Sequence, residues 1–323
     1  MSSEAVAEKA SALAGFPLAQ RVASGYPALL SMHWDSSALP VGIFMTLHAL
    51  RVAYEVRKGQ QTQGYRPPLF QGLFTMLTFS FGGAILTSLA LGRPQAWLES
   101  NVAVPVYSLA YILMTRMPGD LLFWALQSTA PVSDVFLALV DGLIRGYGVT
   151  AAGVDMVRKG MQGQPIADSL VAWVVVGTVL GSGGGIIDDV VQFSKAAWTV
   201  RTPQLLSRGP SLDVKVSFAA TMGYILTTHA WSFAEHAPGF PLSGLLDTLL
   251  RMVPRVSDEE ARLISGMLCA AVLGTSANSQ ARLFAAAERR RQELGRIKKT
   301  DAPVSDDSDA DVEDDADEKD ESE

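Results

Sequence analysis

Glycine and aspartate residues interrupt segments that are otherwise long and apolar. Gly82 and Gly83 lie in LFQGLFTMLTFSFGGAILTSLAL, and GSGGG precedes two adjacent aspartates in SLVAWVVVGTVLGSGGGIIDDVV. A glycine weakens a helix interior by roughly 1 kcal/mol relative to alanine, and a carboxylate in hydrocarbon costs more. Freed backbone carbonyls, hydroxyls and carboxylates can replace the water around a permeating cation, so these residues favour cation coordination. The candidates are Gly82, Gly83, Gly181, Ser182, Gly183, Gly184, Gly185, Asp188 and Asp189.

Two interpretations of the glycines remain open. Small residues let membrane helices pack closely, which is enough to explain an isolated pair. Three glycines in a row, Gly183 to Gly185, favour instead a bend or an unwound turn. Carbonyls freed by such a turn are tolerated only where they line a wet cavity or are covered by protein. The second interpretation would place both clusters, as kinks, on an ion pathway.

Charged residues also lie within or at the ends of apolar segments. Asp141 and Arg145 are four residues apart, so on a helix they share a face and are expected to form a salt bridge. Alternatively, they face an aqueous path or hold an anionic lipid headgroup, and the two interpretations are compatible. Asp120 is a further candidate for the path, while Asp188 and Asp189 would bias a pore mouth toward cations.

Enzymatic and metal-binding signatures are missing from the sequence. It contains no H-E-x-x-H, no G-x-x-x-x-G-K-[ST] and no G-x-S-x-G motif, and we expect no enzymatic activity. The single cysteine, Cys269, and four scattered histidines offer no metal site, so neither metal nor cofactor is expected. The net charge of −7 is uneven, because thirteen acids and one lysine from residue 301 onward carry −12. We expect no nucleic-acid partner.

The composition is that of a membrane protein. Hydrophobic residues make up 48% of the chain and charged residues 18%, and the mean hydropathy is +0.20. A helix needs about 20 mostly apolar residues to cross a bilayer. Seven stretches meet or approach this requirement, which predicts an all-α membrane protein with seven transmembrane helices. They are residues 34–56, 69–91, 101–126, 132–157, 168–192, 213–234 and 260–284.

Basic residues predict the orientation in the membrane. They are about twice as frequent on the side that carries ERRRQELGRIKK after the seventh span, so we expect the C-terminus to be cytosolic and the N-terminus luminal. The first 25 residues lack the pattern of a cleavable signal peptide. The acidic tail has too few apolar residues to fold and is expected to be disordered.

A repeat is indicated by the two glycine clusters, which lie about one hundred residues apart, each in the middle member of a three-helix group. Two such triplets cross the membrane in opposite orientations, as in transport proteins with inverted repeats. The predicted organisation is an N-terminal segment (1–26), a first repeat (27–126), a second repeat (127–236), a seventh helix with its basic flank (237–299) and the acidic tail (300–323).

Several motifs together resemble one family, the trimeric intracellular cation (TRIC) channels. The stretches FGGAILTSLALGRP and MPGDLLFWAL resemble the ends of the family's second and third spans. VVGTVLGSGGGIIDDVVQFSKAAW resembles its fifth-span signature, here with Gly177, Gly181, Ser182, Gly183 and Trp198. Lys215, at the start of the sixth span, also falls where the family has a lysine.

This resemblance implies two inverted triplets plus a seventh helix, in a homotrimer with one pore through each subunit. It implies permeation by potassium and, less well, by sodium, as a counter-current to calcium release across an endoplasmic or sarcoplasmic reticulum-type membrane. Glycine-rich helices two and five would meet at the pore.

The fourth span departs from the family pattern. The family's K-E-V-x-R-x-x-K binds a phosphoinositide lipid, whereas this chain reads VDGLIRGYG there, with Val140 in place of the first lysine. Asp141 matches the acid, and Arg145 aligns only with a shift of one residue. Of the family's lipid ligands, only Arg145 is therefore expected here.

Two other functions remain open. A secondary transporter could use the same inverted repeats, with Asp120 or Asp141 as a coupling carboxylate. A seven-helix receptor or scaffold could recruit partners through the acidic tail and would pass no ions.

Overall fold

The structure, a computed structural model, describes residues 17–34, 41–232, 236 and 242–300. The start of the N-terminal segment and the acidic tail from residue 301 lie outside the described residues, so predictions about them stay predictions. The chain divides into two compact units, residues 1–281 and 282–323. Of the second unit, the structure describes the last part of a long helix.

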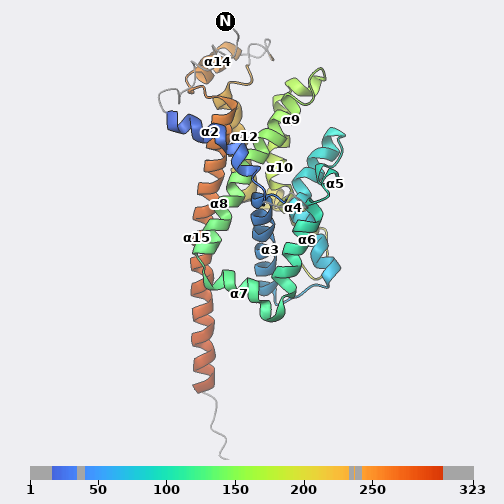
Figure 1. The fold of residues 1–323 in the computed structure, drawn as a ribbon, viewed down its shortest axis with the longest axis vertical. Helices are drawn as coiled ribbons and strands as arrows, with labels where there is room; N and C mark the ends of the chain where they lie inside the picture. The colour runs from blue at the N-terminus through green and yellow to red at the C-terminus, as the bar shows by residue number, and fades with distance from the viewer. Residues whose placement is uncertain (1–16, 35–40, 233–235, 237–241, 301–323) are drawn as a thin grey trace, which may run out of the picture. The chain divides into compact units, whose positions relative to one another are not determined.

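The described residues fold into helices joined by short connections (Figure 1). Most of the predicted spans correspond to one helix or to a run of consecutive helices. In chain order the helices are α2 (Pro17–Leu30), α3 (Ile43–Gln63), α4 (Leu69–Leu91), α5 (Ala96–Glu99), α6 (Ala103–Arg116), η1 (Pro118–Asp120), α7 (Leu121–Ser128), α8 (Val132–Tyr147), η2 (Gly148–Val154), α9 (Asp155–Arg158), η3 (Pro165–Asp168), α10 (Leu170–Val191), α11 (Gln204–Ser207), α12 (Leu212–Thr228), α14 (Ser243–Arg251) and α15 (Asp258–Thr300).

Three helices in the described part of the chain are long and apolar enough to cross a bilayer. They are α4, α10 and the continuous helix that runs through α8, η2 and α9. The described part of the chain is therefore all-α with several membrane-spanning helices, while the count of seven spans stays a prediction.

Helix boundaries follow local sequence signals. Ser169 and Ser211 cap the starts of α10 and α12, each accepting a hydrogen bond from a backbone N–H three residues later. Gly92, with a φ of 62°, ends α4 in the left-handed conformation that suits glycine. The predicted span 101–126 is not one helix, because Pro118 and Gly119, whose φ is 65°, separate α6 from α7.

The fourth span contains a feature that the sequence analysis did not predict. Between α8 and α9 the helix widens into π-helical turns from Gly148 to Val154. Such turns are rare and occur often at functional sites. Gly153, within these turns, lies directly against Gly177 of α10, so the widened segment packs closely on the fifth span.

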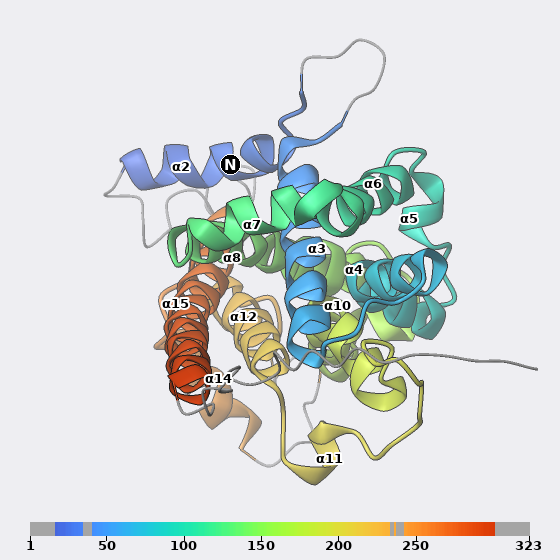
Figure 2. The same ribbon diagram turned by 90° about the horizontal axis from the view of Figure 1, so that it is seen from below.

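Helices α4 and α10 form the centre of the bundle. Figure 2, which looks along the bundle, shows them beside α3, with α6 on one side and α12 on the other. One buried cluster, which includes Tyr54, Met76 and Tyr111, joins α3, α4 and α6. A second, which includes Trp173 and Tyr224, joins α10 and α12. These two clusters hold the glycine-bearing helices between their neighbours.

Candidate functional site

The glycines of α4 and α10 bring the two helix backbones into direct contact. A Cβ atom built on Gly83 would collide with the carbonyl oxygen of Leu180, and one on Gly184 with the carbonyl oxygen of Phe79. A Cβ on Gly82 would lie 2.7 Å from the Cα of Gly184. Any side chain at these positions would therefore push the helices apart.

The unwound turn, one of the two alternatives, is wrong, and close packing describes the role of Gly82, Gly83, Gly183 and Gly184. Both helices are continuous across their clusters, α4 from Leu69 to Leu91 and α10 from Leu170 to Val191. None of these glycines has a positive φ. The physical reason is that the helical hydrogen bonds are kept, while contact with the facing backbone offsets the low helix propensity of glycine.

The contact between the two helices is reciprocal. Gly83 of α4 lies against the carbonyl of Leu180 in α10, and Gly184 of α10 lies against the carbonyl of Phe79 in α4. The two glycines are 101 residues apart in the chain, and so are the two residues that they contact. Two segments related by a pseudo-two-fold axis meet in this way.

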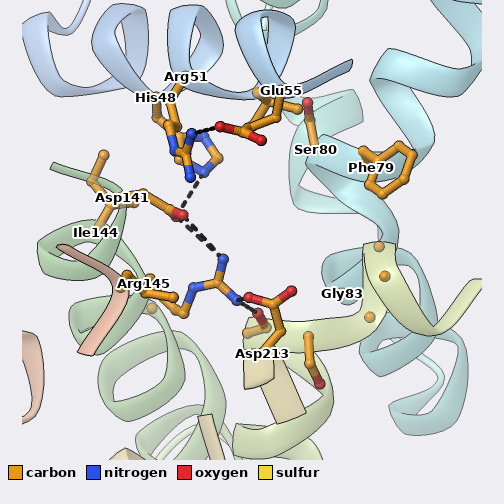
Figure 3. A pocket seen from close by; sticks show the side chains of 18 of the residues that line it. His48, Arg51, Glu55, Phe79, Ser80, Gly83, Asp141, Ile144, Arg145 and Asp213 are labelled. Carbon is orange, nitrogen blue, oxygen red and sulfur yellow. Dashed lines mark hydrogen bonds and ion pairs between the residues drawn. The ribbon is translucent and has the colours of Figure 1, made fainter. Parts of the chain in front are cut away.

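A cavity of about 530 Å³ lies beside the glycine contact. Its wall consists of bare backbone on one side, of charged and polar side chains on the other, and of apolar side chains between them, such as Phe79 and Ile144 (Figure 3). The backbone side includes Gly83 and the whole run Gly181 to Gly185. The polar side is formed by His48, Arg51 and Glu55 of α3, Tyr107 of α6, Asp141 and Arg145 of α8, and Asp213 of α12.

Arg145 links three helices across this cavity. Its Nη2 lies 3.1 Å from Oδ2 of Asp141, so the predicted salt bridge is present. Its Nη1 lies 2.9 Å from Oδ1 of Asp213 and also donates a hydrogen bond to the carbonyl oxygen of Gly181. Figure 3 shows the guanidinium between the two carboxylates. Arg145 therefore occupies the position where carboxylate and backbone oxygens converge.

Helix α3 extends the charged wall of the cavity. Nε2 of His48 lies 3.5 Å from Oδ1 of Asp141, and its Nδ1 lies 2.6 Å from the hydroxyl oxygen of Tyr107. One turn further along, Arg51 pairs with Glu55. The wall thus alternates basic and acidic groups, and it provides both oxygens for a cation and positive charges that would oppose one.

Ser182 is buried and lines the cavity, but its hydroxyl is engaged in its own helix. The Oγ atom donates a 2.7 Å hydrogen bond to the carbonyl oxygen of Thr178. Because the hydroxyl is the donor in this bond, its oxygen keeps both lone pairs for a cation, which is compatible with the predicted role.

Two of the predicted carboxylates, those of Asp120 and Asp188, are held by other groups outside this cavity. Asp120 is buried and lies 2.8 Å from Nη2 of Arg57, and it also pairs with Arg66. The Asp188 carboxylate accepts hydrogen bonds from the backbone N–H and the hydroxyl of Ser194, at 2.8 and 3.0 Å. These two aspartates stabilise the chain at helix ends.

The remaining two candidates also lie away from the cavity. Asp189 lies 3.0 Å from Nη2 of Arg201 and accepts a hydrogen bond from the backbone N–H of Gln204, so it fixes the connection after α10. Lys215 lies in the first turn of α12 and is not part of the cavity wall.

The contribution of α3 was not predicted from the sequence. His48, Arg51 and Glu55 lie inside the predicted span 34–56 at a spacing of three and four residues, which places them on one helix face. Ionisable residues at that spacing within a span are a signal of an internal polar path, and this signal could have been used. Asp213 gave no such signal, because it lies at the edge of its span.

A second charged network joins α9, α12 and α15. Asp155 pairs with Arg158, Lys159 and Arg262 and accepts a 2.9 Å hydrogen bond from the hydroxyl of Tyr224. Asp258, at the start of α15, lies 2.6 Å from Nζ of Lys159. Burial acts to raise the pKa of Asp258, but the hydrogen bond from Lys159 and the neighbouring basic charges outweigh it and lower that pKa below its ordinary value.

Comparison with known proteins identifies the family of this chain. Residues 57–238, more than half of the chain, match the family model of the TRIC channel. The trimeric intracellular cation channel type B of Danio rerio is 28% identical over 154 residues, covering 47% of this chain and 50% of the relative. The type B channel of Xenopus tropicalis is 26% identical over 203 residues, covering 62% and 65%. This chain thus spans about half to two thirds of the length of these relatives.

A solved structure shares the fold. It was determined in work on the activity of TRIC counter-ion channels in calcium release, and it aligns with a TM-score of 0.51 at 20% identity. The alignment covers 72% of this chain and 98% of that structure. On the match to the family model, the chain belongs to the TRIC channel family.

Proposed function

We propose that this protein is a monovalent cation channel of an intracellular membrane, that potassium is its main permeant ion, and that it supplies counter-ion flux during calcium release. We further propose a homotrimer with one pore in each subunit, and sodium as a less permeant ion. The observation that carries the proposal is the polar cavity beside the backbone contact of α4 and α10. The relatives' names describe trimeric intracellular cation channels, which supports it.

The cavity has the groups that a dehydrating cation needs. The carboxylates of Glu55, Asp141 and Asp213 and the carbonyl of Gly181 all belong to its wall. Oxygens of this kind can replace water around potassium.

Arg145 closes this path in the arrangement described. Two like unit charges about 4 Å apart repel by about 4 kcal/mol at an effective dielectric constant of about 20. The carboxylates of Asp141 and Asp213, 3.1 and 2.9 Å from the guanidinium, offset much of this repulsion, so Arg145 acts chiefly by occupying their oxygens and the carbonyl oxygen of Gly181. Opening therefore requires Arg145 to leave the carbonyl of Gly181, which frees this oxygen and both carboxylates for the ion.

The repeat architecture is part of the proposal. Residues 27–126 and 127–236 would form two inverted triplets, followed by a seventh span. The reciprocal contact of Gly83 with Leu180 and of Gly184 with Phe79 supports this arrangement, because an inverted repeat predicts equivalent contacts from the two halves.

Lipid binding at Arg145 is proposed in a restricted form. An anionic headgroup, such as that of a phosphoinositide, would have to replace one of its two carboxylate partners. The side chain of Asp213 is 46% exposed, whereas that of Asp141 is 11% exposed. We therefore propose that a headgroup would displace Asp213 and leave Asp141 in place.

The distribution of basic residues supports a cytosolic C-terminus and a luminal N-terminus. Together with the relatives' description as intracellular channels, it supports a membrane of the endoplasmic or sarcoplasmic reticulum type.

Recording from the purified protein in a planar bilayer tests the proposal. We expect stepwise single-channel currents carried by potassium. If no potassium conductance appears at any voltage or calcium concentration, the proposed function is wrong. Saturable turnover without current steps would favour the alternative, a secondary transporter, for which Asp141 is the better coupling carboxylate because it lines the cavity and Asp120 does not.

A further inference from the structure

Two helices outside the predicted spans turn polar groups toward the protein. In α14, Asp247 is buried and accepts a 3.0 Å hydrogen bond from the hydroxyl of Ser232. In α2, Tyr26 is buried and its hydroxyl donates a hydrogen bond to the carbonyl oxygen of Leu143 in α8. Both helices are therefore held against the bundle by hydrogen bonds, and α2 also packs there through Ala23 and the ring of Tyr26, which contacts Tyr147.

The apolar residues of α14 point outward instead. Leu242, Leu245, Leu249 and Met252 recur at intervals of three and four residues, which places them on one face of the helix and of its two flanking residues. At least half of each side chain is exposed, from 50% at Leu249 to 76% at Met252. An exposed apolar face of this extent is unfavourable in water and marks a contact surface.

Helix α2 repeats this pattern. Leu18, Val22 and Leu29 share one face, with Gly25 between them, and each of the three side chains is exposed. Figure 1 shows α2 and α14 at the same end of the bundle, and Figure 2 shows them on different sides of it.

A third face on each helix is polar and exposed. It carries Arg21 and Ser24 in α2, and Thr248 and Arg251 in α14. Trp34, just after α2, is also exposed. Apolar residues beside basic residues and tryptophan are the composition of helices that lie at the surface of a bilayer.

We propose that α2 and α14 bind the membrane–water interface and lie in its plane, each with its apolar face in the upper acyl-chain region and its arginine toward the anionic headgroups. The bilayer is the occupant that the geometry favours. Each apolar face is bordered by an exposed arginine, Arg21 in α2 and Arg251 in α14, and this pairing of an apolar face with basic residues fits a bilayer surface with anionic headgroups. The inference concerns surfaces outside the cavity and does not depend on ion conduction.

Nitroxide spin labels on the full chain in lipid vesicles test this proposal. One label replaces Leu249 in the variant Leu249→Cys, and another replaces Val22 in Val22→Cys. Matched controls on the polar faces are Thr248→Cys and Ser24→Cys. Cys269 can stay in place because it is buried, and wild-type protein treated in parallel measures its labelling. Oxygen concentrates in lipid, whereas a nickel chelate stays in water. The degree to which each reagent speeds the relaxation of the spin label therefore shows whether the label lies in lipid or in water.

We expect the ratio of oxygen to nickel accessibility to be several-fold higher at Leu249 and Val22 than at Thr248 and Ser24. Equal and high nickel accessibility at all four positions would overturn the proposal, because both faces would then be in water. Strong dipolar broadening between Leu249 labels on different molecules would also overturn it, since a second copy would then cover the face.

Discussion

Arg145 and Asp213 connect α8 to α12 across the cavity, with Nη1 of the arginine 2.9 Å from Oδ1 of the aspartate. The same Nη1 donates a hydrogen bond to the carbonyl of Gly181 in α10. One side chain thus neutralises a carboxylate and engages a backbone oxygen at the glycine run. Both oxygens are unavailable to a cation while Arg145 stays there.

Removing the charge of Arg145 should increase the potassium current. In Arg145→Gln the repulsion of a permeating cation is lost, while Asp141 keeps His48 as a neighbour. We expect a higher open probability or conductance in planar-bilayer recording. The control Arg145→Lys keeps the charge and should keep the current low. A folded Arg145→Gln protein with unchanged or smaller current would contradict the role of Arg145 as a barrier.

A side chain at Gly83 should destabilise the protein. In Gly83→Ala the new methyl group would overlap the carbonyl of Leu180, and overpacking of this kind costs typically about 1–3 kcal/mol. We expect a lower melting temperature in detergent. The matched control is Gly223→Ala in α12, where a Cβ atom would meet nothing within 4 Å. This control should be neutral or slightly stabilising, because alanine favours a helix by about 1 kcal/mol over glycine. Equal melting temperatures for both variants would show that α4 and α10 are not in close contact.

Asp120 should affect stability but not permeation. Asp120→Asn leaves the buried guanidinium of Arg57 without its charged partner, and breaking a buried ion pair costs about 3–5 kcal/mol. We expect a marked loss of thermal stability, with an unchanged single-channel conductance in the protein that remains folded. A normal melting temperature together with altered conductance would instead place Asp120 on the ion path.

Asp258 should contribute stability that is lost in acid. Its pKa is lowered in the folded protein, so the carboxylate is stabilised by folding above the ordinary aspartate pKa of about 3.9. The contribution is complete above that pH and disappears as the pH falls through the lowered pKa. Thermal unfolding of wild type and Asp258→Asn should therefore differ at neutral pH and converge in stronger acid.

The exposed neighbour provides the control for this pH effect. Glu259→Gln should track the wild type at every pH, because Glu259 is exposed and takes no part in the network around Asp155. If the difference between wild type and Asp258→Asn persisted unchanged down to the strongest acid, the ion pairs of Asp258 with Lys159 and Arg158 would not be its source.

The sequence predicts where the membrane helices begin and end better than it predicts irregular turns inside them. Residues 69–91 were predicted as a span and form α4 with the same bounds, since a long apolar run leaves few alternatives. The break in the predicted span 101–126 was also present in the sequence, at Pro118 and Gly119. The π-helical turns from Gly148 were not, because no residue type specifies them.

The roles of glycine and aspartate could not be predicted locally. Whether Gly183 breaks a helix or packs against another depends on what faces it, and that neighbour is Gly83, one hundred residues earlier in the chain. Likewise, Asp141 pairs with Arg145 four residues away, and the sequence predicts this pair. Asp120 pairs with Arg57, which only the fold brings close to it. Spacing identifies partners within one helix and gives no information about partners on another.

The central claim, that ions pass through the cavity beside the glycine contact, is tested most directly by blocking it. Ser80 of α4 lines the cavity, and Ala90 on the same helix is exposed outside it. A positively charged, thiol-specific reagent applied to Ser80→Cys during potassium recording should abolish the current, and the same reagent on Ala90→Cys should leave it unchanged. Full current through Ser80→Cys channels whose modification is confirmed by mass spectrometry would show that the ions take another route.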